Sequence, residues 1–286
     1  MNAATGQFLV LLVVKARHEG ASAFARQVVH WLEARGVQII CVQADEDYAA
    51  LLARDYKLIV VLGGDGTLLD VARRFIMRPI PLLGINFGKV GFLAEARDSN
   101  WQEILADALD GRALHSKCMV LDVEVHRKGE CCFRGHAVND AVVNRGRMAR
   151  VINFDLAVND FDLCRIRADG LIVSSPHGCS GYGVSAGGPL VHPDIHAYTL
   201  VAICPFLCNF PPLVLPSSQA VCIGLSGNST EVHLTLDGQL GYRLENEDRV
   251  VVRGLADGVC LIRRHKDRYL HSLKTRGFLS EQLRTV

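Results

Sequence analysis

The chain has 286 residues, of which 49% are hydrophobic and 21% are charged, and its formal net charge is +1. These values predict a packed globular protein with one large domain or two ordinary ones, and they exclude the strongly basic surface of many nucleic-acid-binding proteins. No apolar run approaches the ~20 residues of a membrane-spanning helix, and the run at 8–14 is typical of a first buried strand. We therefore expect no nucleic-acid partner and no membrane insertion.

The ten cysteines are scattered along the chain and predict no metal site. They include no CxxC pair and no Cys/His spacing of the kind that binds zinc. Most lie in apolar, strand-like runs, which favours free thiols in a reducing compartment. We expect a cytoplasmic protein.

The first part of the chain alternates strand-like and helical patterns. Four apolar runs predict strands, at 8–14, 37–42, 58–62 and 81–86. Between them we expect a helix capped by Ser22 and followed by Gly36, a short helix at 47–54, and a third helix that ends before Pro79. This order predicts a parallel, doubly wound, Rossmann-like sheet with ligands outside the carboxyl ends of its strands.

A glycine-rich turn follows the third strand and precedes a helical pattern. Its residues are Gly63-Gly64-Asp65-Gly66-Thr67. A helix N-terminus offers free N–H groups and a positive dipole end, both of which favour phosphate, and glycine lets the backbone approach a ligand. The turn therefore predicts a phosphate-binding site, with Gly63, Gly64, Gly66 and Thr67 as its frame.

Asp65 is unusual at such a site because a carboxylate repels phosphate. It could hold a divalent cation, or it could accept the proton of a hydroxyl during phosphoryl transfer. Capping of the following helix by Asp65 or Thr67 is an equally weighted alternative.

The pattern changes after residue 114. Before it, Ser99 and Gln102 form a candidate capping box for a helix that Gly111 would end. Beyond it, apolar and polar residues alternate, which predicts antiparallel hairpins with turns at Lys128-Gly129 and Asn159-Asp160. We divide the chain into an N-terminal α/β domain, a β-rich domain and a basic tail that packs back on the first domain, at 1–114, 115–262 and 263–286.

Two stretches of the second domain are candidates for binding. Residues 168–193 are rich in glycine and hydroxyl side chains, which are poor core material and favour a binding surface over a plain surface loop. Asp237-Gly238-Gln239 follows a strand-like run, and a simple hairpin turn is the favoured reading from the residues alone.

Two common nucleotide-binding motifs are missing. There is no GxxxxGK[ST], and the first strand–helix junction at 15–20 has no GxGxxG, which argues against a P-loop enzyme and against an oxidoreductase. A phosphate turn with an acid at its centre instead favours phosphoryl transfer onto a hydroxyl.

Five motifs in order and spacing resemble those of bacterial NAD kinases. They are Gly63-Gly64-Asp65-Gly66-Thr67, Gly84-Ile85-Asn86-Phe87-Gly88 with Gly91-Phe92-Leu93, Asn139-Asp140, Asp169-Gly170-Leu171-Ile172-Val173-Ser174 with Ser185-Ala186-Gly187-Gly188-Pro189, and Asp237-Gly238-Gln239. The resemblance spans about residues 8–275. Lipid kinases and phosphofructokinases share the first motif, whereas the five together are specific.

The resemblance implies transfer of the γ-phosphoryl group of ATP to the 2′-hydroxyl of the adenosine ribose of NAD, giving NADP and ADP. It also implies a divalent cation (Mg²⁺ or Mn²⁺), a β-rich NAD-binding domain, and a homodimer or homotetramer. By position, Asp65 is the proton acceptor. The NAD-binding residues are Asp65, Gly66, Asn139, Asp140, Arg150, Arg167, Asp169, Ser180, Gly181, Tyr182, Gly183, Val184, Ser185 and Gln239.

The chain departs from the family pattern in the loop 175–182, which usually reads Thr-Pro-Thr-Gly-Ser-Thr-Ala-Tyr. Cys179 is favoured as a small replacement for Ser over a redox switch, and His177 is expected either to contact a phosphate or to face solvent. Gly181 loosens the backbone, and Asp140 replaces a Glu that is common in relatives. The tail lacks the usual Lys-Leu-Trp ending. The alternatives are a lipid kinase of the diacylglycerol or sphingosine type and a catalytically impaired NAD-binding regulator.

Overall fold

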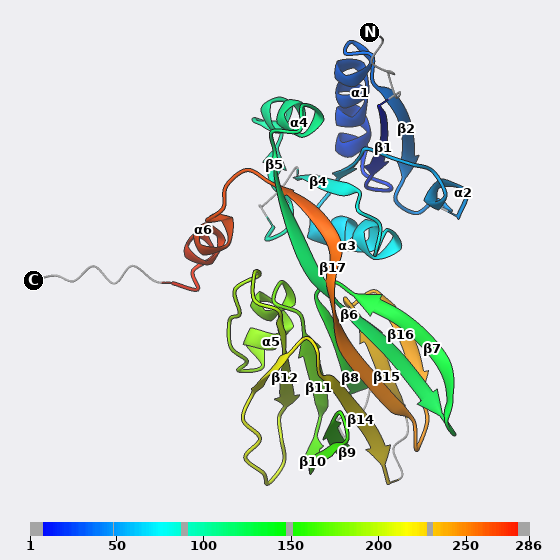
Figure 1. Ribbon diagram of the computed structural model, residues 1–286, viewed down its shortest axis with the longest axis vertical. Helices are drawn as coiled ribbons and strands as arrows, with labels where there is room; N and C mark the ends of the chain where they lie inside the picture. Colours follow the sequence, from blue (N-terminus) through cyan, green and yellow to red (C-terminus); the bar gives the residue numbers. More distant parts are fainter. Residues whose placement is uncertain (1–7, 48, 87–90, 147–150, 228–230, 280–286) are drawn as a thin grey trace, which may run out of the picture. The chain divides into compact units, whose positions relative to one another are not determined.

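The computed structural model describes residues 8–47, 49–86, 91–146, 151–227 and 231–279 (Figure 1). It divides into two compact units, one formed by Met1–Ser116 with Val259–Val286 and the other by Lys117–Gly258. Strands β6 (Leu114–Arg127) and β17 (Arg249–Arg263) carry the chain from one unit to the other. No helix among the described residues has both the length and the apolar character needed to cross a membrane.

The first unit is an α/β unit with a parallel sheet, as expected. Its strands are β1 (Leu9–Val14), β2 (Gln38–Gln43), β3 (Leu58–Leu62), β4 (Pro81–Asn86), the short β5 (Ala96–Arg97) and the last residues of β17. The order is β2-β1-β3-β4, after which β17 pairs with the start of β4 and β5 with its end. Its helices are α1 (Glu19–Glu33), α2 (Ala49–Leu52), α3 (Asp65–Arg74), α4 (Trp101–Leu109) and α6 (Arg268–Thr275).

The central strands of this sheet are buried on both faces. Every residue of β3 is buried, and so are the last five residues of β1, which explains their unbroken apolar sequences. Apolar residues of α1 and α4 pack in the same core, where Trp101 meets Phe24 and Trp31 edge-on at centroid distances of 5.4 and 5.5 Å.

Both predicted helix caps were wrong. Helix α1 begins at Glu19, before Ser22, and the Nδ1 atom of His18 accepts the N–H of Ala21 at 3.1 Å. Helix α4 follows Asn100, not Ser99, and the side chain of Asn100 accepts the N–H of Arg97 at 2.8 Å. Gly36 and Gly111 follow the ends of α1 and α4 with φ of 72° and 70°, which a glycine adopts without strain.

The second unit is β-rich. Its elements are β6, β7 (Glu130–Ala137), β8 (Asp140–Arg145), β9 (Ile152–Val158), β10 (Phe161–Ala168), β11 (Gly170–Ser174), η1 (Gly178–Ser180), α5 (Tyr182–Ser185), β12 (Ala197–Ile203), β13 (Leu213–Pro216), β14 (Ala220–Ser226), β15 (Val232–Leu236), β16 (Leu240–Leu244) and β17. One sheet has the order β13-β12-β11-β8-β15-β16. The second group of strands runs β10-β9-β14-β17, and β6 pairs with both β17 and β7.

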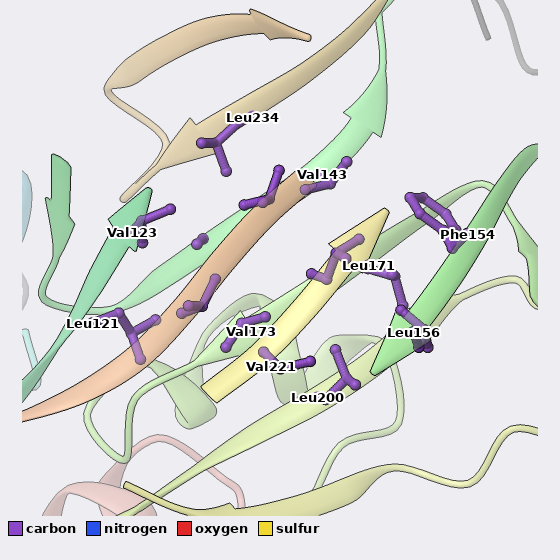
Figure 2. Close-up of a cluster of buried hydrophobic side chains, with 14 of the residues drawn as sticks. Leu121, Val123, Val143, Phe154, Leu156, Leu171, Val173, Leu200, Val221 and Leu234 are labelled. Atoms are coloured by element: carbon purple, nitrogen blue, oxygen red, sulfur yellow. The ribbon is translucent and has the colours of Figure 1, made fainter. Parts of the chain in front are cut away.

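Apolar side chains from both groups of strands form the core of this unit. Figure 2 shows residues of β8, β11, β12 and β15 together with residues of β6, β9 and β14 in one cluster. The alternation expected from the sequence is visible in β15 and in β9 as far as Leu156, where every second residue is buried.

The predicted hairpin turns are present. Lys128-Gly129 joins β6 to β7 and Asn159-Asp160 joins β9 to β10. Asp237 and Gly238 follow β15 with φ of 52° and 66°, and positive φ at both positions matches the right-handed twist of the flanking strands. Asp237 is therefore in a hairpin turn, and its carboxylate also accepts backbone N–H groups from residues 138–140.

Candidate functional site

The turn after β3 has the predicted strand–turn–helix geometry. Gly64 is the N-cap of α3 and makes no side-chain cap hydrogen bond, and the positive end of the helix dipole at this N-terminus favours an anion. A Cβ on Gly63 would lie 2.7 Å from Oγ1 of Thr67, which requires glycine there. A Cβ on Gly64 would meet nothing within 4 Å, so this position is open.

Asp65 does not cap its helix, so the capping alternative is wrong for this residue. It lies at the first helical position, and its carboxylate accepts backbone N–H groups from the segment after β4. Oδ2 accepts from Phe92 at 2.7 Å, and Oδ1 accepts from Leu93 at 3.3 Å and Ala94 at 3.2 Å. A Cβ on Gly91 would lie 1.7 Å from Oδ1. The two glycine-rich strand ends predicted from sequence therefore meet at this carboxylate.

Three of the predicted segments meet at one end of the sheet β13-β12-β11-β8-β15-β16 of the second unit. Strand β8 lies between β11 and β15 and is antiparallel to both, so the start of β8 is next to the ends of its two neighbours. Asn139 and Asp140 lie at the start of β8, the loop beginning at Ser175 follows β11, and Asp237 follows β15. The topology therefore brings together residues that are far apart in the chain.

Hydrogen bonds connect these segments. The carboxylate of Asp237 accepts the N–H groups of Val138 at 3.0 Å, Asn139 at 2.7 Å and Asp140 at 3.2 Å. The carbonyl of Asn139 accepts the N–H of Ser175 at 2.8 Å. A Cβ on Gly178 would lie 2.0 Å from that carbonyl oxygen, which requires glycine at the closest approach of the loop.

Asp140 is in an environment that disfavours its charge. Burial, and then the neighbouring carboxylate of Asp237, raise the pKa of Asp140 to about 7. Its ionisation near neutral pH is thus sensitive to any group that binds beside it.

The altered loop is partly buried. His177 does not face solvent, because it is 8% exposed and its Nε2 lies 3.3 Å from Sγ of Cys118. Cys179 is fully buried with Sγ 3.6 Å from Oγ1 of Thr199, and burial raises the pKa of its thiol. A buried thiol with a raised pKa is a poor nucleophile, which agrees with Cys179 as a small replacement for Ser.

The remainder of this loop is more exposed. Tyr182 is 44% exposed at the start of α5. The hydroxyl of Ser180 donates to the carbonyl of His177 at 3.4 Å, and that of Ser185 donates to the carbonyl of Gly181 at 3.2 Å. Gly183 is buried against Ser174, and Val184 follows it in α5.

The other expected site residues do not take part in the hydrogen bonds between Asn139 and Asp237. The guanidinium of Arg167 lies 5.1 Å from the centroid of the Phe206 ring, and the N–H of Asp169 donates to the carbonyl of Ile203 at 3.0 Å. Gln239 is exposed in the turn that holds Asp237. Arg150 lies outside the described residues.

The structure also identifies functional candidates that sequence reasoning missed. Asp237 entered only as part of a motif, yet its carboxylate orders the backbone of Asn139 and Asp140. Gly91 likewise entered only as part of a motif, and the structure shows that it makes room for the Asp65 carboxylate. No local pattern reveals either contact, because each depends on a partner at least 26 residues away in the sequence.

Within the described part of the chain, Asp65 belongs to no cluster of His, Cys, Asp or Glu side chains that could hold a metal ion. Among the described residues, the group that could hold a metal ion is Glu124, His126 and Cys131, whose ligand atoms lie within 4.8 Å of one another on the β6–β7 hairpin. Glu124 is already paired with His126 at 2.8 Å and with Arg134. Within 63–67, Asp65 is the single carboxylate, so this turn alone offers one protein ligand to a cation.

Comparison with known proteins gives one consistent family. The family model for the ATP-NAD kinase N-terminal domain matches residues 42–113, and the model for the C-terminal domain matches residues 138–263. An NAD kinase of Nitratidesulfovibrio vulgaris (strain Miyazaki F) is 44% identical over 275 residues, covering 96% of this chain and 97% of the relative. An NAD kinase of Oleidesulfovibrio alaskensis is 43% identical over 275 residues, covering 95% of this chain and 94% of the relative.

Two solved structures share the fold. Yeast NADH kinase, solved in complex with NADH, has a TM-score of 0.88 at 22% identity and covers 99% of this chain and 91% of its own. An NAD kinase from Archaeoglobus fulgidus, solved in complex with ATP, has a TM-score of 0.77 at 22% identity and covers 96% of this chain and 100% of its own. At this identity the two structures support the α/β plus β-rich architecture.

Proposed function

The chain belongs to the NAD kinase family, and we propose how its own residues perform that family's reaction. The reaction is transfer of the γ-phosphoryl group of ATP to the 2′-hydroxyl of the adenosine ribose of NAD, which yields NADP and ADP. The observation that carries this function is the match along 96% of the chain, which includes both units. Neither alternative, a lipid kinase or an impaired regulator, finds support in these matches.

We propose that Asp65 accepts the proton of the ribose 2′-hydroxyl. A ribose hydroxyl is a weak nucleophile, and a positioned base is typically worth ~10²–10⁴-fold in rate. A carboxylate has about four acceptor positions, and three backbone N–H groups use three of those of Asp65. The N–H groups fix the direction of the carboxylate, and the remaining position is available for the hydroxyl.

The phosphates of ATP are proposed to lie at the N-terminus of α3. Gly63, Gly64, Gly66 and Thr67 frame this end, and its backbone donors favour the phosphate charge. Mg²⁺ is commonly held by one or two carboxylates together with substrate phosphates, so the divalent cation (Mg²⁺ or Mn²⁺) would arrive with ATP. Because the remaining acceptor position of Asp65 is assigned to the hydroxyl, the cation would be held mainly by the phosphates.

We propose that the NAD-binding residues are Asp65 and Gly66 together with residues of the second unit. Support comes from the hydrogen bonds that fix Asn139 and Asp140 against Asp237 and the Ser175 backbone. The proposed set also contains residues that are exposed at the surface, among them Tyr182, Ser185 and Gln239. Its further members are Arg150, Arg167, Asp169, Ser180, Gly181, Tyr182, Gly183, Val184, Ser185 and Gln239.

Three further features are proposed from the family. They are the division into a nucleotide-binding α/β domain at 1–114, an NAD-binding domain at 115–262 and a tail at 263–286, a homodimer or homotetramer, and a cytoplasmic location. The scattered free cysteines support a reducing compartment. Analytical ultracentrifugation tests the oligomeric state directly.

An NADP-formation assay tests the function. The purified protein with NAD, ATP and Mg²⁺ should form NADP, and parallel reactions with other nucleoside triphosphates and with polyphosphate define the donor. The Asp65→Asn variant should lose at least ~10²-fold in kcat while largely keeping NAD affinity. Near-normal turnover by this variant would contradict the role of Asp65 as general base. Phosphorylation of a lipid without NADP formation would favour the lipid kinase over the NAD kinase.

A further inference from the structure

The segment 91–95 is held on both of its backbone edges. Its N–H groups at Phe92, Leu93 and Ala94 donate to the carboxylate of Asp65. Its carbonyl groups accept from two arginine side chains near the C-terminal end of the described chain. The direction of the Asp65 carboxylate therefore depends on a segment whose opposite edge is bound by guanidinium groups.

Arg263 and Arg268 divide these carbonyls between them. Nη1 of Arg263 donates to the carbonyls of Phe92 at 3.2 Å and Leu93 at 3.1 Å. Nη2 of Arg268 donates to the carbonyls of Ala94 at 3.3 Å and Gly91 at 3.4 Å. The two side chains are only 11% and 15% exposed, so water competes weakly for their donors.

Glu95 compensates the charge of these arginines. Its side chain is 3% exposed, and its Oε2 lies 3.2 Å from Nε of Arg268 and 3.7 Å from Nη1 of Arg263. Its backbone N–H donates to the carbonyl of Gly84 in β4 at 3.1 Å, which ties the segment to the sheet. Removing one member of such a buried group leaves the others with unpaired charge, so the three residues act as a unit.

The two arginines come from two different elements. Arg263 is the last residue of β17, whose Cys260 and Leu261 pair with Pro81 and Leu82 of β4. Arg268 is the first residue of α6. A third arginine of the same region, Arg276, stacks its guanidinium on the Phe92 ring at 4.3 Å.

We propose that Arg263, Arg268 and Glu95 are positioning residues that orient the carboxylate of Asp65 through the backbone of segment 91–95. The proposal rests on the role assigned to Asp65 above. Each guanidinium binds two carbonyl groups and so fixes the orientation of the peptide groups in segment 91–95. The three N–H groups of this segment then fix the orientation of the Asp65 carboxylate. Because a misplacement of about 1 Å in a reacting group can cost ~10²-fold in rate, such a contact affects kcat without touching substrate.

The test compares Arg268→Gln with wild type in steady-state kinetics. We expect kcat to fall about 10- to 100-fold while the KM values for NAD and ATP change less than about threefold. Arg268→Lys keeps the charge but loses the planar fork, so it should recover part of the rate. Arg264→Gln is the matched control, because Arg264 pairs with the exposed Glu103 at 3.0 Å and should leave kcat unchanged.

A double-mutant cycle separates positioning from a general structural role. In the Asp65→Asn background, Arg268→Gln should lower kcat less than about twofold, since the group that it positions is already gone. An equal loss in both backgrounds would overturn the proposal, as would unchanged kcat in Arg268→Gln. If Arg268→Gln does not fold, as judged by thermal unfolding, Arg263→Lys and Glu95→Gln replace it in the double-mutant cycle. A smaller loss of kcat in the Asp65→Asn background again supports the proposal, and an equal loss again overturns it.

The cycle also distinguishes this inference from the proposed function. If Asp65→Asn itself has near-normal kcat, the general-base role fails and the positioning role fails with it. If Asp65→Asn loses its activity but the arginine variants keep theirs, the positioning inference alone is wrong.

Discussion

The carboxylate of Asp237 accepts the backbone N–H of Asn139 at 2.7 Å, although 98 residues separate them in the sequence. The same carboxylate binds the N–H groups of Val138 and Asp140. A hairpin turn thereby fixes the backbone that presents two proposed NAD-binding side chains. This contact would make the turn a part of the proposed binding surface without requiring Asp237 to touch NAD.

The first prediction concerns Asp237→Asn. Asparagine tolerates the positive φ of this position, but its amide nitrogen cannot accept an N–H, so at least one backbone donor loses its partner. We expect KM for NAD to rise about tenfold, which corresponds to about 1.4 kcal/mol, with a smaller change in KM for ATP. Asp160→Asn, in the exposed β9–β10 turn, is the control; equal KM values for NAD in both variants would contradict the prediction.

The second prediction concerns Gly178→Ala. The new Cβ would lie 2.0 Å from the carbonyl oxygen of Asn139, and a backbone atom cannot move aside cheaply. We expect a loss of about 2 kcal/mol or more in the free energy of unfolding, with weaker NAD binding. Denaturant unfolding and calorimetric titration with NAD measure the two effects. Gly241→Ala, whose Cβ would meet nothing within 4 Å, should match wild type, and similar stability for the two variants would refute the clash.

The third prediction concerns Gly91→Ala. A Cβ at this position would lie 1.7 Å from Oδ1 of Asp65, so either the carboxylate or the segment must move. We expect kcat to fall at least ~10²-fold in the NADP-formation assay. Gly20→Ala in α1 is the control, since its Cβ would lie 3.3 Å from the movable His18 ring and alanine favours a helix. Retained activity in Gly91→Ala would show that the carboxylate position is not critical.

The fourth prediction concerns pH. The pKa of Asp140 is raised from 3.8 to about 7 in the folded protein, so between these values the folded state holds a proton that the unfolded chain has lost. This group therefore makes the free energy of unfolding fall as pH rises from about 4 to about 7. Asp140→Asn removes that dependence, so the variant should gain about 1–3 kcal/mol relative to wild type at pH 8 compared with pH 5. A difference between the proteins that is the same at both pH values would exclude the raised pKa.

Much of the fold could be predicted because its signals are local. The buried runs of β1 and β3 contain no polar residue, and the turn at Lys128-Gly129 lies between alternating strands. The helix caps could not be predicted, because several polar residues that can cap a helix lie near each helix start. His18 and Asn100 occupy positions that Ser22 and Ser99 were expected to fill, since the helices begin where packing against the sheet allows.

The motif residues of the candidate site could be predicted from the sequence, but the long-range contacts that hold them in place could not. Asp65 and Asn139 are recognised from neighbouring residues in the sequence. The carbonyl contacts of Arg263 and Arg268 depend on where β17 pairs with β4, and no short pattern encodes that register. Long-range contacts of this kind are fixed by the assembled sheet, so they become visible only with the structure.

The division of the chain at Ser116 and Val259 has a consequence for biosynthesis. The α/β unit lacks its β17 strand, its helix α6 and both carbonyl-binding arginines until Val259–Val286 has been made. The β-rich unit, Lys117–Gly258, is contiguous and is complete earlier. Domains usually fold in the order in which the ribosome delivers them. Here we expect the middle of the chain to reach its native state first, and a release of the nascent chain before residue 259 would leave segment 91–95, which binds the Asp65 carboxylate, without its arginine contacts.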